Sequence, residues 1–141
     1  MDRFTIGHAS DSGTIEFFDR CPDDPSLPIE ECWVKVAVPG LTATRQISIA
    51  MCISPMSLFN DMARRWKGWE GELAWDSWEN DLELRCSQSN RGHVAIEIEM
   101  RTGYHPEAWS IRAVIGTTAG QLDSIKGHSA AFFGSCWNDE T

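Results

Sequence analysis

The chain has 141 residues, 21 of them acidic and 12 basic, and its formal net charge at pH 7 is -9. This length suits one domain, so we expect a single domain over residues 1–141 with a frayed tail over residues 134–141. The acidic balance disfavours the phosphate backbone of a nucleic acid as a partner and favours a basic protein, although solubility alone also explains such a charge.

Membrane insertion and secretion are not indicated by the sequence. No apolar run approaches the roughly 18 residues that cross a bilayer, and the first residues lack the basic and apolar segments of a signal peptide. We therefore expect a cytoplasmic protein without a membrane partner. The five cysteines are odd in number and form no C-x-x-C pair, which favours reduced thiols that pack as small apolar groups.

The first half of the chain predicts four strands and a helix. Hydrophobic alternation favours strands over residues 4–6, 14–18, 32–38 and 46–53, the last two joined as a hairpin by a longer loop. Ser54 and Pro55 are typical of a helix start, and the helix should continue to about Trp66 before Gly68 ends it. The predicted buried stripe of this helix consists of Leu58, Phe59, Met62, Ala63 and Trp66.

The second half predicts an antiparallel meander followed by a helix. Alternation is clean over residues 82–86, 94–100 and 109–115, which gives one apolar and one charged face. A final helix over about 118–133 would bury Leu122, Ile125, Ser129 and Phe132. The expected fold is therefore α+β: an antiparallel sheet of about seven strands with two helices, one after strand four and one C-terminal.

Catalytic and metal-binding patterns are absent from the sequence. The four histidines are far apart, and none has the spacing of a zinc site. The stretch Gly116–Gly120, between a strand and a helix, is only a faint indication of an anion site, and an ordinary helix-start loop explains it better. We expect no enzymatic activity, no cofactor and no metal.

The segment from Trp66 to Asp81 holds four of the seven tryptophans among carboxylates and glycines. Such a cluster is either the contact between a helix and a sheet or a recognition surface. We favour core packing for Trp66, Trp69 and Trp75, whereas Trp78 and the acids are freer to bind.

The sequence of this segment and of the residues that flank it also resembles that of a known group of proteins. The pattern consists of Phe59-x-x-Met62-Ala63-x-x-Trp66-x-Gly68-Trp69-x-Gly71, then Trp75-x-Ser77-x-Glu79-x-Asp81-Leu82-x-Leu84, then Gly92-His93-Val94-x-Ile96. It resembles small bacterial proteins of unknown function, many from actinobacteria, that look like the WapI-type immunity proteins. The resemblance covers about the last two-thirds of the chain.

What the resemblance implies is a noncatalytic cytoplasmic protein that binds and neutralises a cognate toxin. A basic toxin cleft built for phosphates would attract a surface rich in carboxylates. The predicted partner-binding residues are the acids of the segment, two tryptophans and two acids of the following meander: Trp69, Glu70, Glu72, Asp76, Trp78, Glu79, Asp81, Glu97 and Glu99.

Two alternatives stand beside this prediction. The carboxylates of the meander, Glu83, Glu97 and Glu99, can instead pair with Arg85, Arg101 and Arg112 across the strands, which would be a structural role. An intracellular small-ligand or carbohydrate-binding domain that uses a tryptophan-rich site is the alternative function. The oligomeric state is not indicated by the sequence.

Overall fold

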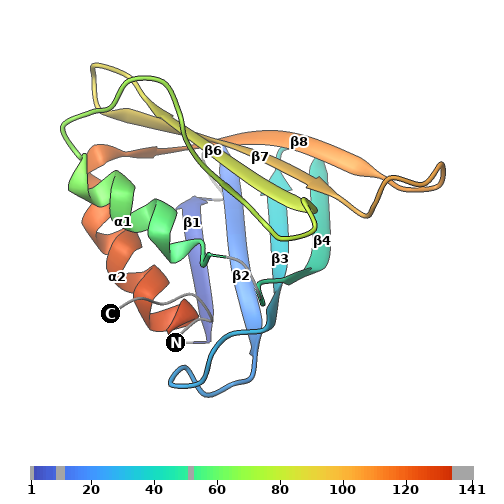
Figure 1. The fold of residues 1–141 in the computed structure, drawn as a ribbon. Coiled ribbons are helices and arrows are strands. Elements are labelled where there is room, and N and C mark those ends of the chain that lie inside the picture. Colours follow the sequence, from blue (N-terminus) through green and yellow to red (C-terminus); the bar gives the residue numbers. More distant parts are fainter. Residues whose placement is uncertain (1, 9–11, 51–52, 135–141) are drawn as a thin grey trace.

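The computed structural model describes residues 2–8, 12–50 and 53–134. The fold is α+β and contains two antiparallel sheets of four strands, each sheet followed in the chain by a helix (Figure 1). The first sheet has the strand order β1 (Arg3–His8), β2 (Gly13–Cys21), β3 (Glu31–Val38) and β4 (Leu41–Ser48). The second has the order β5 (Leu73–Asp76), β6 (Leu82–Gln88), β7 (His93–Arg101) and β8 (Ser110–Thr118).

The hairpin between β3 and β4 is tighter than predicted. Val38 pairs with Leu41, so Pro39 and Gly40 alone make the turn, and Gly40 adopts the positive φ of 82° that favours glycine. The strand β4 is hard to recognise because its inward-facing residues are only half-buried up to Arg45. The strand β4 also ends at Ser48, earlier than predicted. Of the remaining predicted strand residues, Ile53 is 61% exposed, and residues 51 and 52 lie outside the described residues.

The first helix, α1 (Met56–Arg64), confirms the predicted start and most of the predicted stripe. The backbone N–H of Met56 donates to Ser54 Oγ at 3.1 Å, as a serine near a helix start can accept. The helix buries Leu58, Phe59, Met62 and Ala63. The prediction was wrong for Trp66, which is 55% exposed, because α1 ends at Arg64 and the chain turns before the stripe reaches this residue.

The second sheet contains a strand that the sequence did not reveal. β5 has four residues and lies at the sheet edge, where Leu73 pairs with Cys86 and Asp76 pairs with Glu83. Only Trp75 of this strand is buried. One buried residue in four gives no recognisable alternation, so the segment resembled a turn.

The last helix consists of a short 3₁₀ turn (Ala119–Gln121) and α2 (Leu122–Phe133). It buries Leu122, Ile125, Ser129 and Phe132 as predicted, together with Phe133. Only Gly134 of the predicted tail lies in the described part of the chain, where it follows α2.

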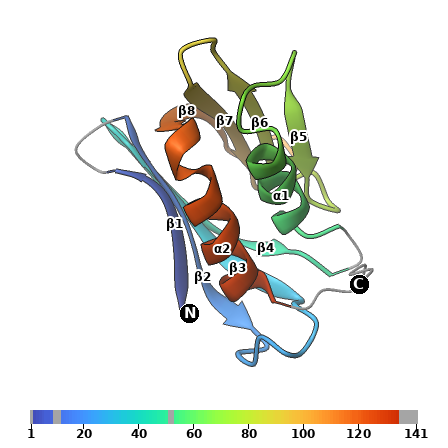
Figure 2. The same cartoon turned by 90° about the vertical axis from the view of Figure 1, so that its left-hand side faces the viewer.

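The helices fill the wedge between the two sheets. The sheets converge where β8 contacts β1, β2 and β3, and they diverge on the other side, where α1 packs against α2 (Figures 1 and 2). Among the described residues, three aromatic ring contacts join the helices to the first sheet there: Phe4 with Phe59 at 5.4 Å, Phe4 with Phe133 at 6.0 Å and Phe17 with Phe133 at 5.4 Å between centroids. Edge contacts of this kind add to the apolar burial that holds the layers together.

A buried arginine fastens α2 to the first sheet. One extra residue bulges β2 between Phe18 and Cys21, and Asp19 there has a φ of 50°. Arg20 consequently points inward and is 7% exposed. Its guanidinium donates to the carbonyls of Phe132 and Phe133 at 3.0 and 2.9 Å, which are unsatisfied groups at the helix end. It also donates to the carbonyls of Pro22, Asp24 and Leu27 in the loop after β2.

The described cysteines have free thiols. Cys32 and Cys86 are buried in strands, and burial raises the pKa of each thiol to about 12. Cys21 is exposed, so the prediction of buried, reduced thiols holds for two of the three described cysteines. Neither helix of the described residues has the length and apolar character that a membrane-spanning helix needs.

Candidate functional site

Six exposed side chains follow the open edge of the second sheet, and we call them the tryptophan–acid edge. They begin after α1, run beside the edge strand β5 and end in the turn before β6: Trp66, Glu70, Glu72, Asp76, Trp78 and Glu79. Trp66 and Trp78 are 55% and 63% exposed. A surface of this kind combines large apolar anchors with negative charge.

The segment is held in place by tryptophans that face inward. Trp75 is buried, and its indole Nε1–H donates to the carbonyl of Ile53 at 2.6 Å, just before α1. Trp69 is half-buried, and its Nε1–H donates to the carbonyl of Cys86 in β6 at 3.0 Å. A third bond of 3.0 Å joins Gln88 Nε2 to the carbonyl of Trp66. Two tryptophans thus anchor the backbone, which leaves Trp66 and Trp78 outside the core.

The acids of the edge are free of ion pairs. None of Glu70, Glu72, Asp76 and Glu79 has a cationic partner within 4 Å among the described residues, and all four are exposed. The nearby Lys67 places its Nζ 5.6 Å from the ring centroid of Trp66 instead. The edge therefore carries uncompensated negative charge.

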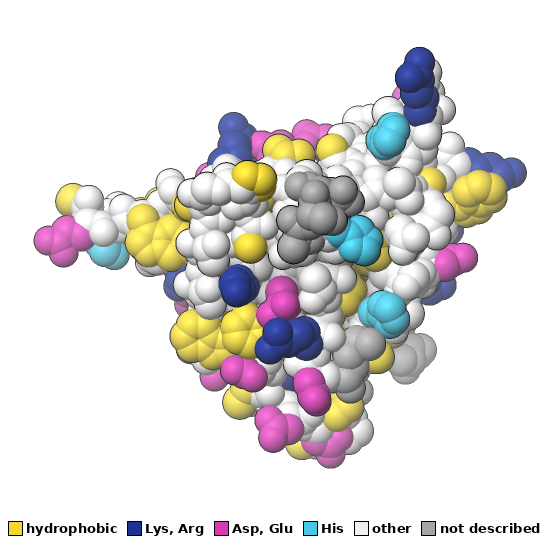
Figure 3. Space-filling view, turned by 180° about the vertical axis from the view of Figure 1, so that it is seen from behind, with side chains coloured by type: hydrophobic (Ala, Val, Ile, Leu, Met, Phe, Trp, Pro, Cys, Tyr) yellow, Lys and Arg dark blue, Asp and Glu magenta, His cyan; other side chains and the backbone are white. Residues whose placement is uncertain are grey.

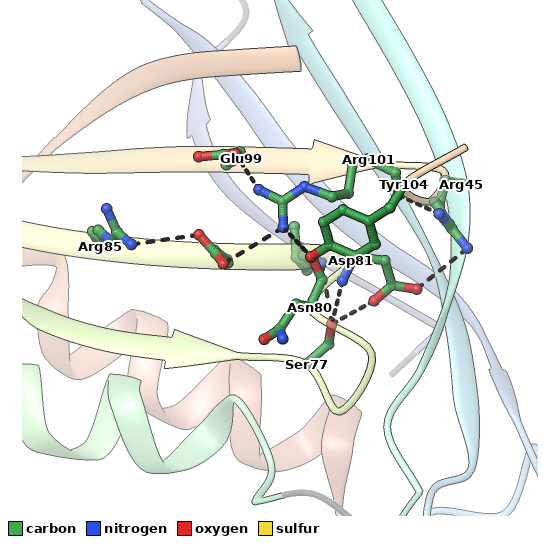
Figure 4. Close-up of polar contacts among 10 residues, drawn as sticks. Arg45, Ser77, Asn80, Asp81, Arg85, Glu99, Arg101 and Tyr104 are labelled. Carbon is green, nitrogen blue, oxygen red and sulfur yellow. Dashed lines mark hydrogen bonds and ion pairs between the residues drawn. The ribbon is translucent and has the colours of Figure 1, made fainter. Parts of the chain in front are cut away.

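Asp81, which the sequence placed on the same surface, has a different position. It is 5% exposed, and its Oδ2 lies 3.3 Å from Nη2 of Arg45, which belongs to the first sheet (Figure 4). Ser77 donates its hydroxyl to Asp81 and accepts the backbone N–H groups of Asp81 and Leu82 at 3.1 Å each. Arg45 also donates to the carbonyl of Arg101 in β7. These contacts form a clasp between the sheets, so Asp81 has no surface to offer a partner.

The outer face of the second sheet is electrically balanced. It brings Glu97 and Glu99 together with Glu83, but each carboxylate has an arginine beside it. Arg112 Nε lies 2.6 Å from Glu97 Oε1, and Arg101 contacts both Glu83 and Glu99. The predicted pairing across the strands is confirmed for Glu97 with Arg112 and for Glu83 with Arg101, whereas Glu99 pairs with Arg101 of its own strand. Glu97 and Glu99 therefore lie among ion pairs with arginines on the outer face, which the tryptophan–acid edge adjoins where Asp76 pairs with Glu83.

Two features of the surface were not predicted from the sequence. Trp66 was assigned to the core, although a helix end two residues earlier would have indicated its exposure. His8 and His93, which are far apart in sequence, line one open cavity of about 790 Å³ at the other end of the second sheet. They belong to different sheets, and only the packing of the two sheets brings them together, so no sequence spacing could have indicated it. In the described part of the chain, no three His, Cys, Asp or Glu side chains are grouped to hold a metal ion.

Comparison with known families identifies one match. A family model covers residues 6–135, which is most of the chain. The chain belongs to DUF6228, a family of unknown function. Comparison with curated proteins and with solved structures finds no significant match in either set. Membership of the family therefore assigns no activity, and the edge and the cavity must be interpreted from their own chemistry.

Proposed function

We propose that this protein is a noncatalytic, cytoplasmic binding protein that docks a basic protein on the tryptophan–acid edge. The observation that carries the proposal is the exposure of Trp66 and Trp78 beside four carboxylates that form no ion pair with any described residue. The resemblance of the same segment to small bacterial proteins, many from actinobacteria, that look like the WapI-type immunity proteins supports a toxin as the partner.

The segment has inward-facing tryptophans that anchor it and exposed tryptophans and acids that are free to make contacts, which is the arrangement expected of a binding surface. Affinity in protein complexes is concentrated in a few large side chains, and tryptophan is the most enriched of them. Unpaired charges mainly raise the association rate by steering an oppositely charged partner. A rigid attachment through Trp69 and Trp75 lowers the entropy that such a surface would lose on binding.

The experiment compares two charge-reversal variants of equal net charge. The first changes Glu70, Glu72, Asp76 and Glu79 to lysine, and the control changes the exposed acids Asp2, Asp23, Glu30 and Glu107 to lysine. Each variant gains 8 units of charge, from -9 to -1. A basic protein captured by the tagged parent from its native cells is purified, and its association rate with each variant is measured at low and moderate salt.

We expect the edge variant to lose binding and the control variant to keep most of it, because steering depends on where the charges lie. The captured protein should also be toxic when expressed alone, and the parent chain should restore growth. Equal loss in both variants would reject the edge as the interface, and a partner that is not toxic would reject the immunity role.

The alternative function places tryptophans around a small ligand. The cavity of about 790 Å³ is lined by no tryptophan among the described residues, and the exposed tryptophans of the edge lie elsewhere. A sugar-stacking site is therefore less well supported than a protein interface.

A further inference from the structure

We propose that the open cavity beside β8 binds a small organic anion, a ligand with an apolar body and a carboxylate or phosphate group. This site is separate from the tryptophan–acid edge and does not depend on the proposed toxin partner. The cavity has a volume of about 790 Å³, within the range of small-molecule sites.

The floor of the cavity is hollow because three neighbouring strands place small residues in one row. Ser87 in β6 pairs with Ala95 in β7, which pairs with Gly116 in β8. These positions face away from the core. The next row of the sheet has the much larger residues Arg85, Glu97 and Val114, so the small row forms a depression.

Three other segments build the walls. The β1–β2 hairpin contributes His8 and Ser12, the β6–β7 turn contributes Ser89 and His93, and the start of the last helix contributes Gln121. The hairpin is fastened to the sheet edge by the backbone N–H of Gly116, which donates to Ser12 Oγ at 2.7 Å. Figure 3 shows histidine side chains on the right half of the rear face, on a surface that consists mostly of backbone and of side chains that are neither charged nor hydrophobic.

The hydroxyls of Ser12 and Ser89 and the imidazoles of His8 and His93 can each donate a hydrogen bond to a ligand in the cavity. Ser12 Oγ already accepts from Gly116, and Ser89 Oγ accepts the N–H groups of Arg91 and His93 at 3.3 Å each. Neither hydroxyl proton is donated to another described residue, and neither imidazole of His8 and His93 has a side-chain partner there. Donors converging on a cavity favour a ligand rich in acceptors.

Charge also favours an anion at this place. In a chain of net charge -9, the described lining of the cavity includes no aspartate or glutamate. Glu97 lies two residues along β7 from Ala95, and its carboxylate is paired with Arg112. The methyl groups of Ala95, Val114 and Thr118 supply apolar contacts for the body of the ligand. An organic anion satisfies both the donors and the apolar floor.

The test uses three probes that share a benzene ring: benzoate, phenyl phosphate and the neutral benzyl alcohol. Each is titrated to millimolar concentration into the ¹⁵N-labelled chain, and the backbone amide signals of Gly116, Ser12 and His93 are followed by NMR. We expect at least one anion to shift these signals in a saturable manner and benzyl alcohol to bind at least about tenfold more weakly. Comparison of the two anions distinguishes a carboxylate from a phosphate site.

Matched variants locate the binding. Ala95→Leu and Ser87→Leu fill the floor at solvent-facing positions, whereas Ala74→Leu adds the same bulk on the outer face at β5, away from the cavity. We expect either filling variant to weaken the anion at least about tenfold, His8→Gln or His93→Gln to weaken it severalfold, and Ala74→Leu to leave it unchanged.

The proposal is overturned if no anion shifts the cavity amides, if benzyl alcohol binds as tightly as the anions, or if both folded filling variants bind like the parent. The dispersed NMR spectrum of each variant serves as the check of its fold.

Discussion

The clasp between the sheets and the tryptophan–acid edge lie within one stretch of chain and use the same types of residue, yet their environments are opposite. Asp81 is buried and has Arg45 and Ser77 as partners, whereas Glu79, two residues earlier, is exposed and has no cationic partner among the described residues. A buried charge is tolerated only with its partners present, and an exposed charge without one is available to another molecule. The comparison separates residues that hold the fold from residues free to bind.

The largest expected effect on stability concerns Arg20. Like Asp81 in the clasp, Arg20 is a buried charged residue that has hydrogen-bond partners. Arg20→Met should lower the free energy of unfolding by about 3 kcal/mol or more, because five carbonyls, two of them at the end of α2, lose their donor. Urea unfolding measures the change. Arg64→Met removes an exposed arginine paired with Asp61 and should change stability by no more than about 0.5 kcal/mol. Similar effects from both variants would contradict the role of Arg20.

The second prediction tests the two carboxylates directly. Asp81→Asn should lower the free energy of unfolding by about 2 kcal/mol, because the half-buried guanidinium of Arg45 loses its counter-charge in the buried carboxylate of Asp81. Glu79→Gln should stay within about 0.5 kcal/mol of the parent. The same urea measurement applies to both, and the comparison fails if Glu79→Gln is the more harmful change.

The third prediction separates the anchoring tryptophans from the exposed ones. Trp75→Phe should lower the free energy of unfolding by about 1–2 kcal/mol, since the carbonyl of Ile53 loses its donor and a small void forms. Trp78→Phe should change it by less than about 0.5 kcal/mol. Thermal and urea unfolding with matched spectra measure both. A stable Trp75→Phe variant would mean that β5 is held mainly by its strand pairing.

The smallest effect on stability at neutral pH concerns the thiols. Because burial raises the pKa of Cys32 and Cys86 to about 12, neither should react with iodoacetamide at pH 8 until urea unfolds the chain, whereas exposed Cys21 should react at once. Peptide mass spectrometry measures this order. The raised pKa also means that the stability from these neutral thiols is complete below pH 9 and is lost as pH rises toward 12. Rapid labelling of Cys32 in the folded chain would contradict its burial.

Local patterns were sufficient for much of the fold. In α1, the buried face follows the helical spacing of Leu58, Phe59 and Met62, and in β7 it follows the alternation that includes Ile96 and Ile98. Residues close in sequence therefore indicate which side of each element is buried. The α+β class and the positions of both helices followed from those periods. The arginine partner of Glu97, Arg112 of the neighbouring strand, was also predictable, because cross-strand pairs follow from alternation in a meander.

The split into two sheets and the short strand β5 could not be derived in the same way. Which strand becomes an edge depends on packing across the whole molecule, and four residues with one buried side chain carry no period. The burial of Asp81 likewise depends on Arg45, a residue of the other sheet.

The sequence by itself determined both helices and most of the strands of this protein, the density of acids and tryptophans in one segment and the overall negative charge. Only the tertiary structure decided which of those side chains face water and which histidines meet at a cavity. The physical reason is distance along the chain: periodicity acts over a few residues, whereas His8 and His93, or Arg45 and Asp81, come together only when separate strands pair and the sheets pack.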